Sequence, residues 1–454
     1  MRSRRPAATL TYNLPMTPIS WTVRGLRREL ADGRLDPMQL AAEALARANG
    51  NAGANTYLWR DAEWTRSEAQ RAEAIPAAAG GAFGDGRSAL WGIPVSVKDC
   101  FDLAGTPNSC GTRFYRQRNG IAGRDSWLVE RLRALGAVIT GKTHLHPLAY
   151  GITGENPEFG DCIQPGAADA LTGGSSSGAS ASVLEGSAVA AIGTDTGGSV
   201  RAPAALCGLA GYRASLGRGD WRGGAHLAES FDTFGWLFRD LEDAPLLNLP
   251  FAPQGAKAAR SFTRFAYVGD AFLHDCEPQV RASFAALIRE LEELGLQGRA
   301  VDVGWWSDST EIFAPIQASE AARLHAGNFE HFEPLIRARL AWGASQSGDE
   351  IARLRQRHAE FRERMDELFA GDELLMLPSI PIATLTVAAA KSAEGDAIRK
   401  RLLRYTTPFS LAGVPCVAIP CAAGGMQLAA GREMDEALLE LAAALGRRRR
   451  EKQV

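Results

Sequence analysis

Residues 173–201, GGSSSGASASVLEGSAVAAIGTDTGGSVR, hold two glycine-rich clusters that carry serine. The clusters span 173–178 and 193–201, and their key serines, Ser175 and Ser199, stand 24 positions apart. Glycine at this density lets backbone approach a ligand closely and turns N–H groups toward a developing negative charge. A serine that ends such a run has the surroundings that a nucleophile needs. The stretch therefore predicts a site for acyl transfer.

Upstream of these clusters, Lys98 ends an expected buried strand, GIPVSVKD at 92–99. Lys98 and the two serines could together supply the base and the nucleophile of an acyl-transfer enzyme that needs no histidine. Helical and strand patterns alternate along the chain, which is typical of an α/β protein, most simply of one domain. The expected helices are 36–48, 61–74, 127–135, 178–191, 280–294 and 351–368, and the expected strands are 92–99, 137–140, 374–377 and 414–419.

Composition limits the class of protein. The 454 residues, 46% hydrophobic and 22% charged, suit a globular chain with a large core. A net charge of -2 gives no general attraction to nucleic acid or to an anionic membrane. The seven scattered cysteines predict a reducing, cytoplasmic compartment rather than a disulfide framework or a zinc site. No apolar run reaches the ~18 residues of a spanning helix, and the arginines at 4–5 lack the apolar segment of a secretory signal.

Two motifs offer competing functions. Residues 136–143, GAVITGKT, fit the P-loop pattern for nucleotide binding letter for letter. Here, however, a helical stripe precedes Gly136 and strand-favouring residues replace the flexible turn, so we interpret Gly136 as a helix C-cap and the rest as a strand. Residues 174–178, GSSSG, fit a nucleophile elbow with Ser176 as nucleophile, but no hydrophobic strand precedes them. We favour neither motif.

The clusters and Lys98 together resemble the amidase signature family. The resemblance extends to the lysine strand at 90–99 (LWGIPVSVKD), to 230–236 (SFDTFGW) and to 407–415 (TPFSLAGVP), so that it covers roughly residues 85 to 435. It implies a single large mixed β-sheet covered on both faces by α-helices. It also implies an N-terminal helical segment at 1–84 in the same domain, the amidase signature domain at 85–435, and a C-terminal helix with a basic tail at 436–454.

The resemblance further implies a serine–cis-serine–lysine triad. Ser199 would be the nucleophile, Lys98 the base, and Ser175 the bridge between them across a cis Gly174–Ser175 peptide. A lysine can act as a base near neutral pH only if burial lowers its pKa. We expect Asp195 and Arg201 to pair and hold the loop. The residues expected at the oxyanion hole or against the substrate are Thr196, Gly197, Gly198, Gly174 and Ser176.

Some positions depart from the family's usual pattern. Ser177 replaces a glycine, and YRAS at 212–215 replaces Leu-Lys-Pro-Thr; both features resemble the branch with indole-3-acetamide hydrolases. Pro147 replaces a glutamate, which that branch does not explain.

The expected activity is hydrolysis of linear carboxamides to carboxylate and ammonia or amine, through an acyl-enzyme. The alternatives are the A subunit of a tRNA-dependent amidotransferase, a P-loop nucleotide binder and a catalytically silent scaffold. We expect no metal, including at His144 and His146, and no organic cofactor. The expected partner is a small amide substrate rather than nucleic acid or a membrane, and a homodimer is left open.

Overall fold

A computed structural model describes residues 21–77, 82–251, 261–371 and 373–452. The arginines at 4–5 lie outside these residues. Within them, eleven strands form one sheet in the order β1-β3-β2-β4-β6-β5-β10-β11-β9-β7-β8. The expected α/β class with a single large sheet is confirmed. The strands are β1 Tyr57–Trp59, β2 Pro94–Lys98, β3 Val138–Thr143, β4 Ala190–Asp195, β5 Ala210–Arg213, β6 Thr233–Phe238, β7 Arg264–Val268, β8 Gln297–Val301, β9 Glu373–Pro378, β10 Cys416–Ile419 and β11 Met426–Ala429.

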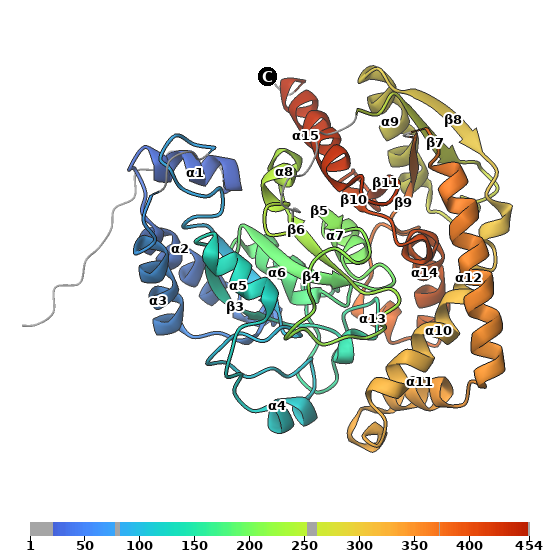
Figure 1. Cartoon of the computed structure of the whole chain (residues 1–454), viewed down its shortest axis with the longest axis horizontal. Helices are drawn as coiled ribbons and strands as arrows, with labels where there is room; N and C mark the ends of the chain where they lie inside the picture. Colours follow the sequence, from blue (N-terminus) through green and yellow to red (C-terminus); the bar gives the residue numbers. More distant parts are fainter. Residues whose placement is uncertain (1–20, 78–81, 252–260, 372, 453–454) are drawn as a thin grey trace, which may run out of the picture.

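The sheet is mixed, as expected. Strand β2 is parallel to β3 and β4, whereas β6 is antiparallel to both β4 and β5. Strand β10 joins the two halves of the sheet, because it pairs antiparallel with β5 and with β11. Strand β1 pairs with β3, so the segment before residue 84 contributes a strand to this same sheet. In Figure 1 the N-terminal helices α1–α3 lie at one side of the molecule and α9–α12 at the other.

Apolar side chains cover both faces of the sheet at β4. Ala191 packs with Ala179 and Val183 of α6, whereas its neighbour Ile192 belongs to the main core with Trp236. Successive side chains of a strand point to opposite faces, so β4 is buried on both sides. This explains why its sequence is a continuous run of small and apolar residues rather than an alternating one.

The long helices start where local sequence signals place them. Helix α2 has a capping box between Asp36 and Gln39, with Pro37 in its first turn. Helix α9 begins at Pro278. No helix in the described ranges is both long and apolar enough to cross a membrane. The helices are α1 Val23–Ala31, α2 Pro37–Gly50, α3 Ala62–Glu73, α4 Arg113–Asn119, α5 Trp127–Ala134, α6 Ser177–Glu185, α7 Arg201–Leu206, α8 Ala244–Leu247, α9 Pro278–Glu293, α10 Ser309–Leu324, α11 Pro334–Ala344, α12 Gly348–Leu368, α13 Val387–Ala390, α14 Gly395–Ala412 and α15 Asp435–Glu451.

The helix expected over 178–191 is shorter than the sequence suggested. Helix α6 ends at Glu185, because Gly186 takes a left-handed conformation (φ 80°) and its N–H caps the Ser182 carbonyl. The chain then enters β4 at Ala190. Both segments are rich in alanine and serine, so their composition did not mark the boundary between helix and strand.

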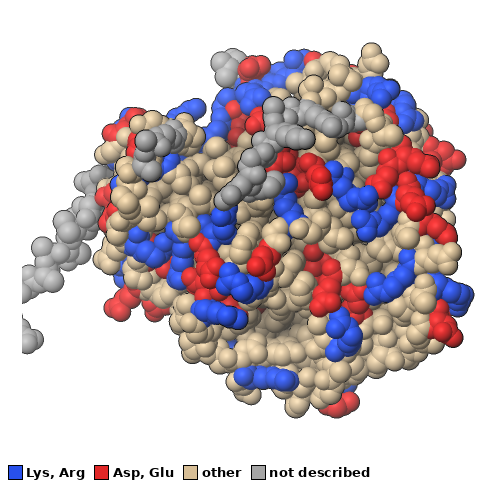
Figure 2. Space-filling model, viewed as in Figure 1, with Lys and Arg blue, Asp and Glu red and all other residues tan. Residues whose placement is uncertain are grey.

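Charged residues of both signs are interspersed on the face of the molecule shown in Figure 2. The positive and negative side chains lie next to one another there rather than in separate patches, which suits the small net charge of the chain.

Candidate active site

Lys98 is the last residue of β2, between β3 and β4, and its side chain is fully buried. Its Nζ donates hydrogen bonds to Ser175 Oγ at 2.7 Å, to Thr194 Oγ1 at 2.8 Å and to Ser176 Oγ at 3.1 Å. In the described part of the chain no carboxylate forms an ion pair with it. The amine is therefore held by three hydroxyl groups rather than by a counter-ion.

This environment lowers the pKa of Lys98. Burial is the main cause, because it disfavours the charged ammonium, and the nearby Cys100, Cys110 and Asp232 oppose it only in part. A lysine with a lowered pKa carries more of the neutral amine near pH 7, which is the form that accepts a proton.

Ser175 follows a cis peptide bond from Gly174, the geometry that the family resemblance implies. A side chain at Gly174 would not fit, since a Cβ there would lie 2.7 Å from the Gly154 nitrogen. The Ser175 side chain is fully buried, and its carbonyl accepts a hydrogen bond from the His146 N–H at 3.2 Å. The backbone therefore fixes Ser175 on both sides, with its hydroxyl against Lys98.

Ser199 lies between β4 and α7, in the second glycine cluster, and is 6% exposed. Its carbonyl accepts a hydrogen bond from the Ser176 N–H at 3.3 Å, which joins the two glycine clusters. Among the described residues, no hydrogen bond links the Ser175 and Ser199 hydroxyls directly. The structure thus brings Lys98 and Ser175 into contact and places Ser199 beside the same cluster.

Buried charges anchor the loop that leads to Ser199. The Asp195 carboxylate accepts hydrogen bonds from the N–H groups of Gly198 at 2.8 Å and Val200 at 3.2 Å. It also forms ion pairs with Arg201 at 2.9 Å and Arg213 at 2.8 Å. Burial alone would raise the pKa of Asp195, but the two guanidinium groups hold that pKa below its usual range. The Asp195–Arg201 pair was expected, whereas Arg213 was noted only as a departure from the family pattern.

Two further contacts hold the loop from more distant segments. Thr406 of α14 donates a hydrogen bond to the Gly197 carbonyl at 2.5 Å. Thr196 Oγ1 donates to the Asp232 carboxylate, also at 2.5 Å. A Cβ at Gly197 would lie 2.8 Å from the Phe313 ring, so an aromatic side chain of α10 packs directly on the loop. The sequence does not reveal these partners, because only the fold brings them to the loop.

The structure does not support the competing motifs. Residues 138–143 of the P-loop pattern form strand β3, and Gly136 follows the end of α5 with a positive φ of 78°. Lys142 is fully buried, pairs with Asp99 at 2.5 Å and donates to the Pro107 carbonyl. Ser176, the serine of the elbow pattern, is a buried partner of Lys98 and donates to the Thr194 carbonyl at 3.3 Å.

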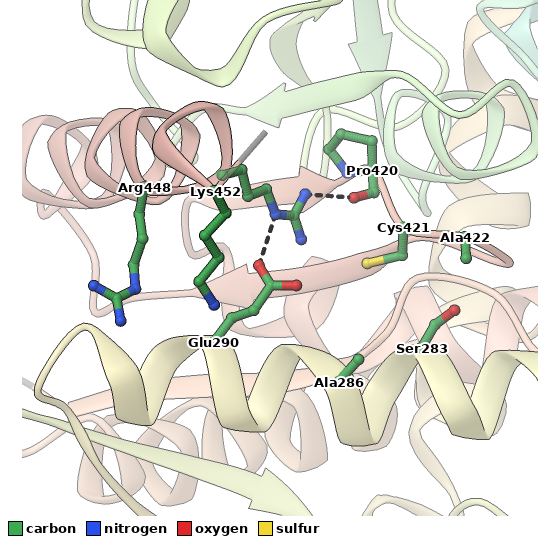
Figure 3. Close-up of a pocket in the computed structure, with 9 residues that line it drawn as sticks. Ser283, Ala286, Glu290, Pro420, Cys421, Ala422, Arg448 and Lys452 are labelled. Atoms are coloured by element: carbon green, nitrogen blue, oxygen red, sulfur yellow. Dashed lines mark hydrogen bonds and ion pairs between the residues drawn. The ribbon is translucent and has the colours of Figure 1, made fainter. Parts of the chain in front are cut away.

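A separate cavity of about 540 Å³ lies between α9, α15 and the turn from β10 to β11 (Figure 3). None of the residues that line it belongs to the lysine–serine cluster. Arg449 also lines it and donates to Glu290 at 2.7 Å and to the Pro420 carbonyl at 2.7 Å. This cavity is therefore not the candidate active site.

The candidate site is thus a buried lysine among serine hydroxyls, beside an anchored glycine loop on this mixed sheet. The Amidase family model matches residues 40–439, and the chain belongs to this family.

The chain is 29% identical to an indoleacetamide hydrolase from Pseudomonas savastanoi, over 88% of this chain and 89% of that protein. It is 32% identical to the A subunit of the glutamyl-tRNA(Gln) amidotransferase from Anaeromyxobacter dehalogenans (strain 2CP-C), over 82% of this chain and 85% of that protein. A solved structure described as an amidase, 28% identical, superposes with a TM-score of 0.82 over 94% of this chain and 99% of that one.

Proposed function

We propose that this amidohydrolase cleaves linear carboxamides to a carboxylate and ammonia or an amine, through an acyl-enzyme on Ser199. The observation that carries the proposal is the 2.7 Å hydrogen bond from Lys98 Nζ to Ser175 Oγ, in a site where burial lowers the pKa of the lysine. Neutral Lys98 has two N–H groups and one lone pair, so it donates to Ser176 and Thr194 and can accept a proton from Ser175, which leaves Ser175 able to accept the proton of Ser199.

In the proposed acylation step, Ser199 Oγ attacks the substrate carbonyl carbon. The Ser199 proton moves to Ser175, and the Ser175 proton moves to Lys98. The carbonyl oxygen becomes an anion, and backbone N–H groups of the anchored loop stabilise it. The relay then runs in reverse and protonates the leaving nitrogen, so the carbon–nitrogen bond breaks. Water attacks the acyl-enzyme by the same proton route, which releases the carboxylate and restores Ser199.

The proposed oxyanion donors are the N–H groups of Thr196, Gly197 and Ser199, whereas the Gly198 N–H, which the sequence placed among them, donates to the Asp195 carboxylate. Their support is the anchoring of this loop by Asp195, since donors that are fixed before the reaction lose no energy in reorienting. Ser176 holds the Lys98 amine in place, and the missing side chain of Gly174 lets the backbone of Gly154 pack directly beside the Gly174–Ser175 peptide.

Small amides with an apolar acyl group, including arylacetamides, are the proposed substrates. Two observations support this choice. The Phe313 ring and Leu403 lie against Gly197, next to the proposed oxyanion donors. The chain also resembles an indoleacetamide hydrolase along most of its length. We further propose a cytoplasmic location, because all seven cysteines are free.

A second function, that of an amidotransferase A subunit, is favoured by the 32% identity to one such protein. Such a protein would release ammonia from glutamine for a partner rather than act alone. The two functions differ in a simple measurement: the amidase releases ammonia from simple amides as a purified single chain, whereas the amidotransferase chain needs its partner.

The test is an ammonia-release screen of the purified chain over aliphatic, aryl and amino-acid amides. We expect turnover of one or more apolar amides and none in Ser199→Ala. Turnover that persists in Ser199→Ala would refute the acyl-enzyme on Ser199. Activity on glutamine alone, and only with added partner chains, would favour the second function.

A further inference from the structure

Asp232 links the glycine loop to a histidine at the molecular surface. One carboxylate oxygen, Oδ1, accepts the Thr196 hydroxyl at 2.5 Å, and the other, Oδ2, lies 3.0 Å from His226 Nδ1. The Asp232 side chain is 2% exposed, whereas that of His226 is 24% exposed. A continuous chain of hydrogen bonds therefore runs from the surface to Thr196.

The chain of hydrogen bonds has a defined direction. An ionised carboxylate only accepts hydrogen bonds, so Thr196 donates its hydroxyl proton and His226 carries its proton on Nδ1. The N–H groups of Leu227 and Ala228 also donate to Oδ2, at 2.9 and 3.0 Å. Asp232 is thus held in one orientation by four donors.

Aromatic stacking fixes the histidine. The His226 ring stacks on Trp221, with ring centroids 4.4 Å apart, and Trp221 stacks in turn on Phe234 of β6, at 4.8 Å. Phe234 pairs with Thr194 in the sheet, so this stack stands beside the strand that leads into the glycine loop. His226 is consequently a rigid donor rather than a freely rotating surface side chain.

The three anchors of the loop differ in their access to solvent. Asp195, which holds Gly198, and Thr406, which holds Gly197, are both fully buried. The third anchor is the hydrogen bond from the Thr196 hydroxyl to Asp232, which in turn contacts His226. Of the three anchors, therefore, the one at Thr196 reaches a partly exposed group.

We propose that His226, acting through Asp232, is a positioning residue that keeps the Thr196 N–H aimed at the oxyanion. This inference rests on the function proposed above, in which Thr196 supplies an oxyanion donor. Hydrogen bonds to a carboxylate are shorter and stronger than those between neutral groups. With the His226 donor lost, Oδ2 keeps only the Leu227 and Ala228 N–H groups, so the carboxylate is held less firmly and can shift, and Thr196, which donates to its other oxygen, shifts with it. Because the oxyanion forms only in the transition state, the change acts on kcat rather than on KM.

The test is a double-mutant cycle between His226→Phe and Thr196→Val. Phenylalanine keeps the stack on Trp221 and removes only the Nδ1 donor, and valine replaces the Thr196 hydroxyl with a methyl group. We expect His226→Phe to lower kcat about tenfold, less than the ~100-fold or more that loss of a whole oxyanion donor costs, with KM unchanged. In the Thr196→Val background, His226→Phe should not lower kcat further, because the hydrogen bond between Asp232 and Thr196 is already lost. Thr196→Ser should keep most of the activity.

A second readout does not depend on knowing the amide substrate. A fluorophosphonate probe phosphonylates an activated serine, fluoride leaves, and the phosphoryl oxygen occupies the oxyanion position. We expect wild-type labelling at Ser199, with the labelling rate reduced about tenfold in His226→Phe and with no change in His274→Phe, a substitution at an exposed histidine on another segment. Thermal unfolding of each variant separates a positioning effect from loss of the folded state.

The outcomes are distinct. Independent, additive effects of the two substitutions, or a rise in KM at constant kcat, would overturn the positioning role. Labelling that is as fast in His226→Phe as in the wild type would do the same. If the wild type shows neither labelling of Ser199 nor amide hydrolysis, the proposed function fails, and the inference fails with it.

Discussion

Two fully buried lysines lie on adjacent strands. Replacing each in turn separates effects on the chemistry of the site from effects on the stability of the folded protein. Lys98 on β2 donates to three hydroxyl groups, whereas Lys142 on β3 forms an ion pair with Asp99 at 2.5 Å. Methionine has nearly the length and volume of lysine without its charge. We predict that Lys98→Met removes activity with little change in stability. Lys142→Met, in contrast, should lower the stability with little change in activity per folded molecule.

The magnitudes follow from what each substitution leaves behind. Lys98→Met loses three hydrogen bonds of about 0.5–1.5 kcal/mol each, but it also removes a buried amine whose desolvation costs a comparable amount. We therefore expect its free energy of unfolding to change by less than ~2 kcal/mol. Lys142→Met leaves the Asp99 carboxylate buried without its counter-ion, which costs about 3–5 kcal/mol. For activity, losing the proposed base at Lys98 should cost ~100- to 10,000-fold in kcat.

Urea unfolding followed by circular dichroism gives the first quantity, and ammonia release per folded molecule gives the second. The reasoning would be refuted if Lys98→Met destabilised the protein as much as Lys142→Met does. It would be refuted equally if folded Lys142→Met lost as much activity as Lys98→Met, since that would remove the distinction between the base and the structural ion pair.

Three further outcomes are expected. Because the pKa of Lys98 is lowered only in the folded protein, the unfolded chain binds more protons between that lowered pKa and the ordinary value of 10.5. The free energy of unfolding should therefore rise with pH across this window, and urea unfolding at several pH values should find this contribution absent in Lys98→Met. Asp195→Asn leaves two buried guanidinium groups without their shared counter-ion, so it should cost about 3–5 kcal/mol, and an unchanged urea midpoint would contradict this. Gly197→Ala places a Cβ 2.8 Å from the Phe313 ring and should displace the loop, lowering kcat by up to ~100-fold. Gly348→Ala, where the space is open, is its control, and equal activity of the two variants would count against the packing argument.

Sequence periodicity predicted the elements that have strong local signals. Helix α9 follows from its apolar stripe and from Pro278 in its first turn, and β2 follows from a run of buried apolar residues. The boundary at Gly186 was missed because alanine and serine occur on both sides of it, so neither a helical nor a strand pattern dominates. The pairing of β10 with β5 joins strands that lie far apart in the chain, and no local pattern specifies such a contact.

The residues of the candidate site likewise fall into those that local sequence marks and those that only the tertiary fold brings together. The residues that the glycine clusters mark, Ser175 and Ser199, could be named from the sequence, and Lys98 from its strand together with the family resemblance. Thr406 and His226 could not, because each reaches the loop only through the tertiary fold and neither lies in a motif that specifies such a contact. Asp232 was visible inside a segment that resembles the family, but its bond to Thr196 was not.

The contacts of the candidate site are divided between the two halves of the chain. The lysine–serine cluster and the Asp195 anchor lie within residues 98–213, on β2, β4, β5 and the loops between them. The later half of the chain supplies Thr406, which fixes a backbone carbonyl, and Phe313, which packs on the loop from outside. Substitutions on α10 should therefore alter the surroundings of the proposed acyl group while the proposed proton relay stays intact. We therefore predict that Phe313→Ala changes which amides are hydrolysed in the ammonia-release screen before it changes the rate at which a fluorophosphonate labels Ser199, and slower labelling with an unchanged range of amides would contradict this.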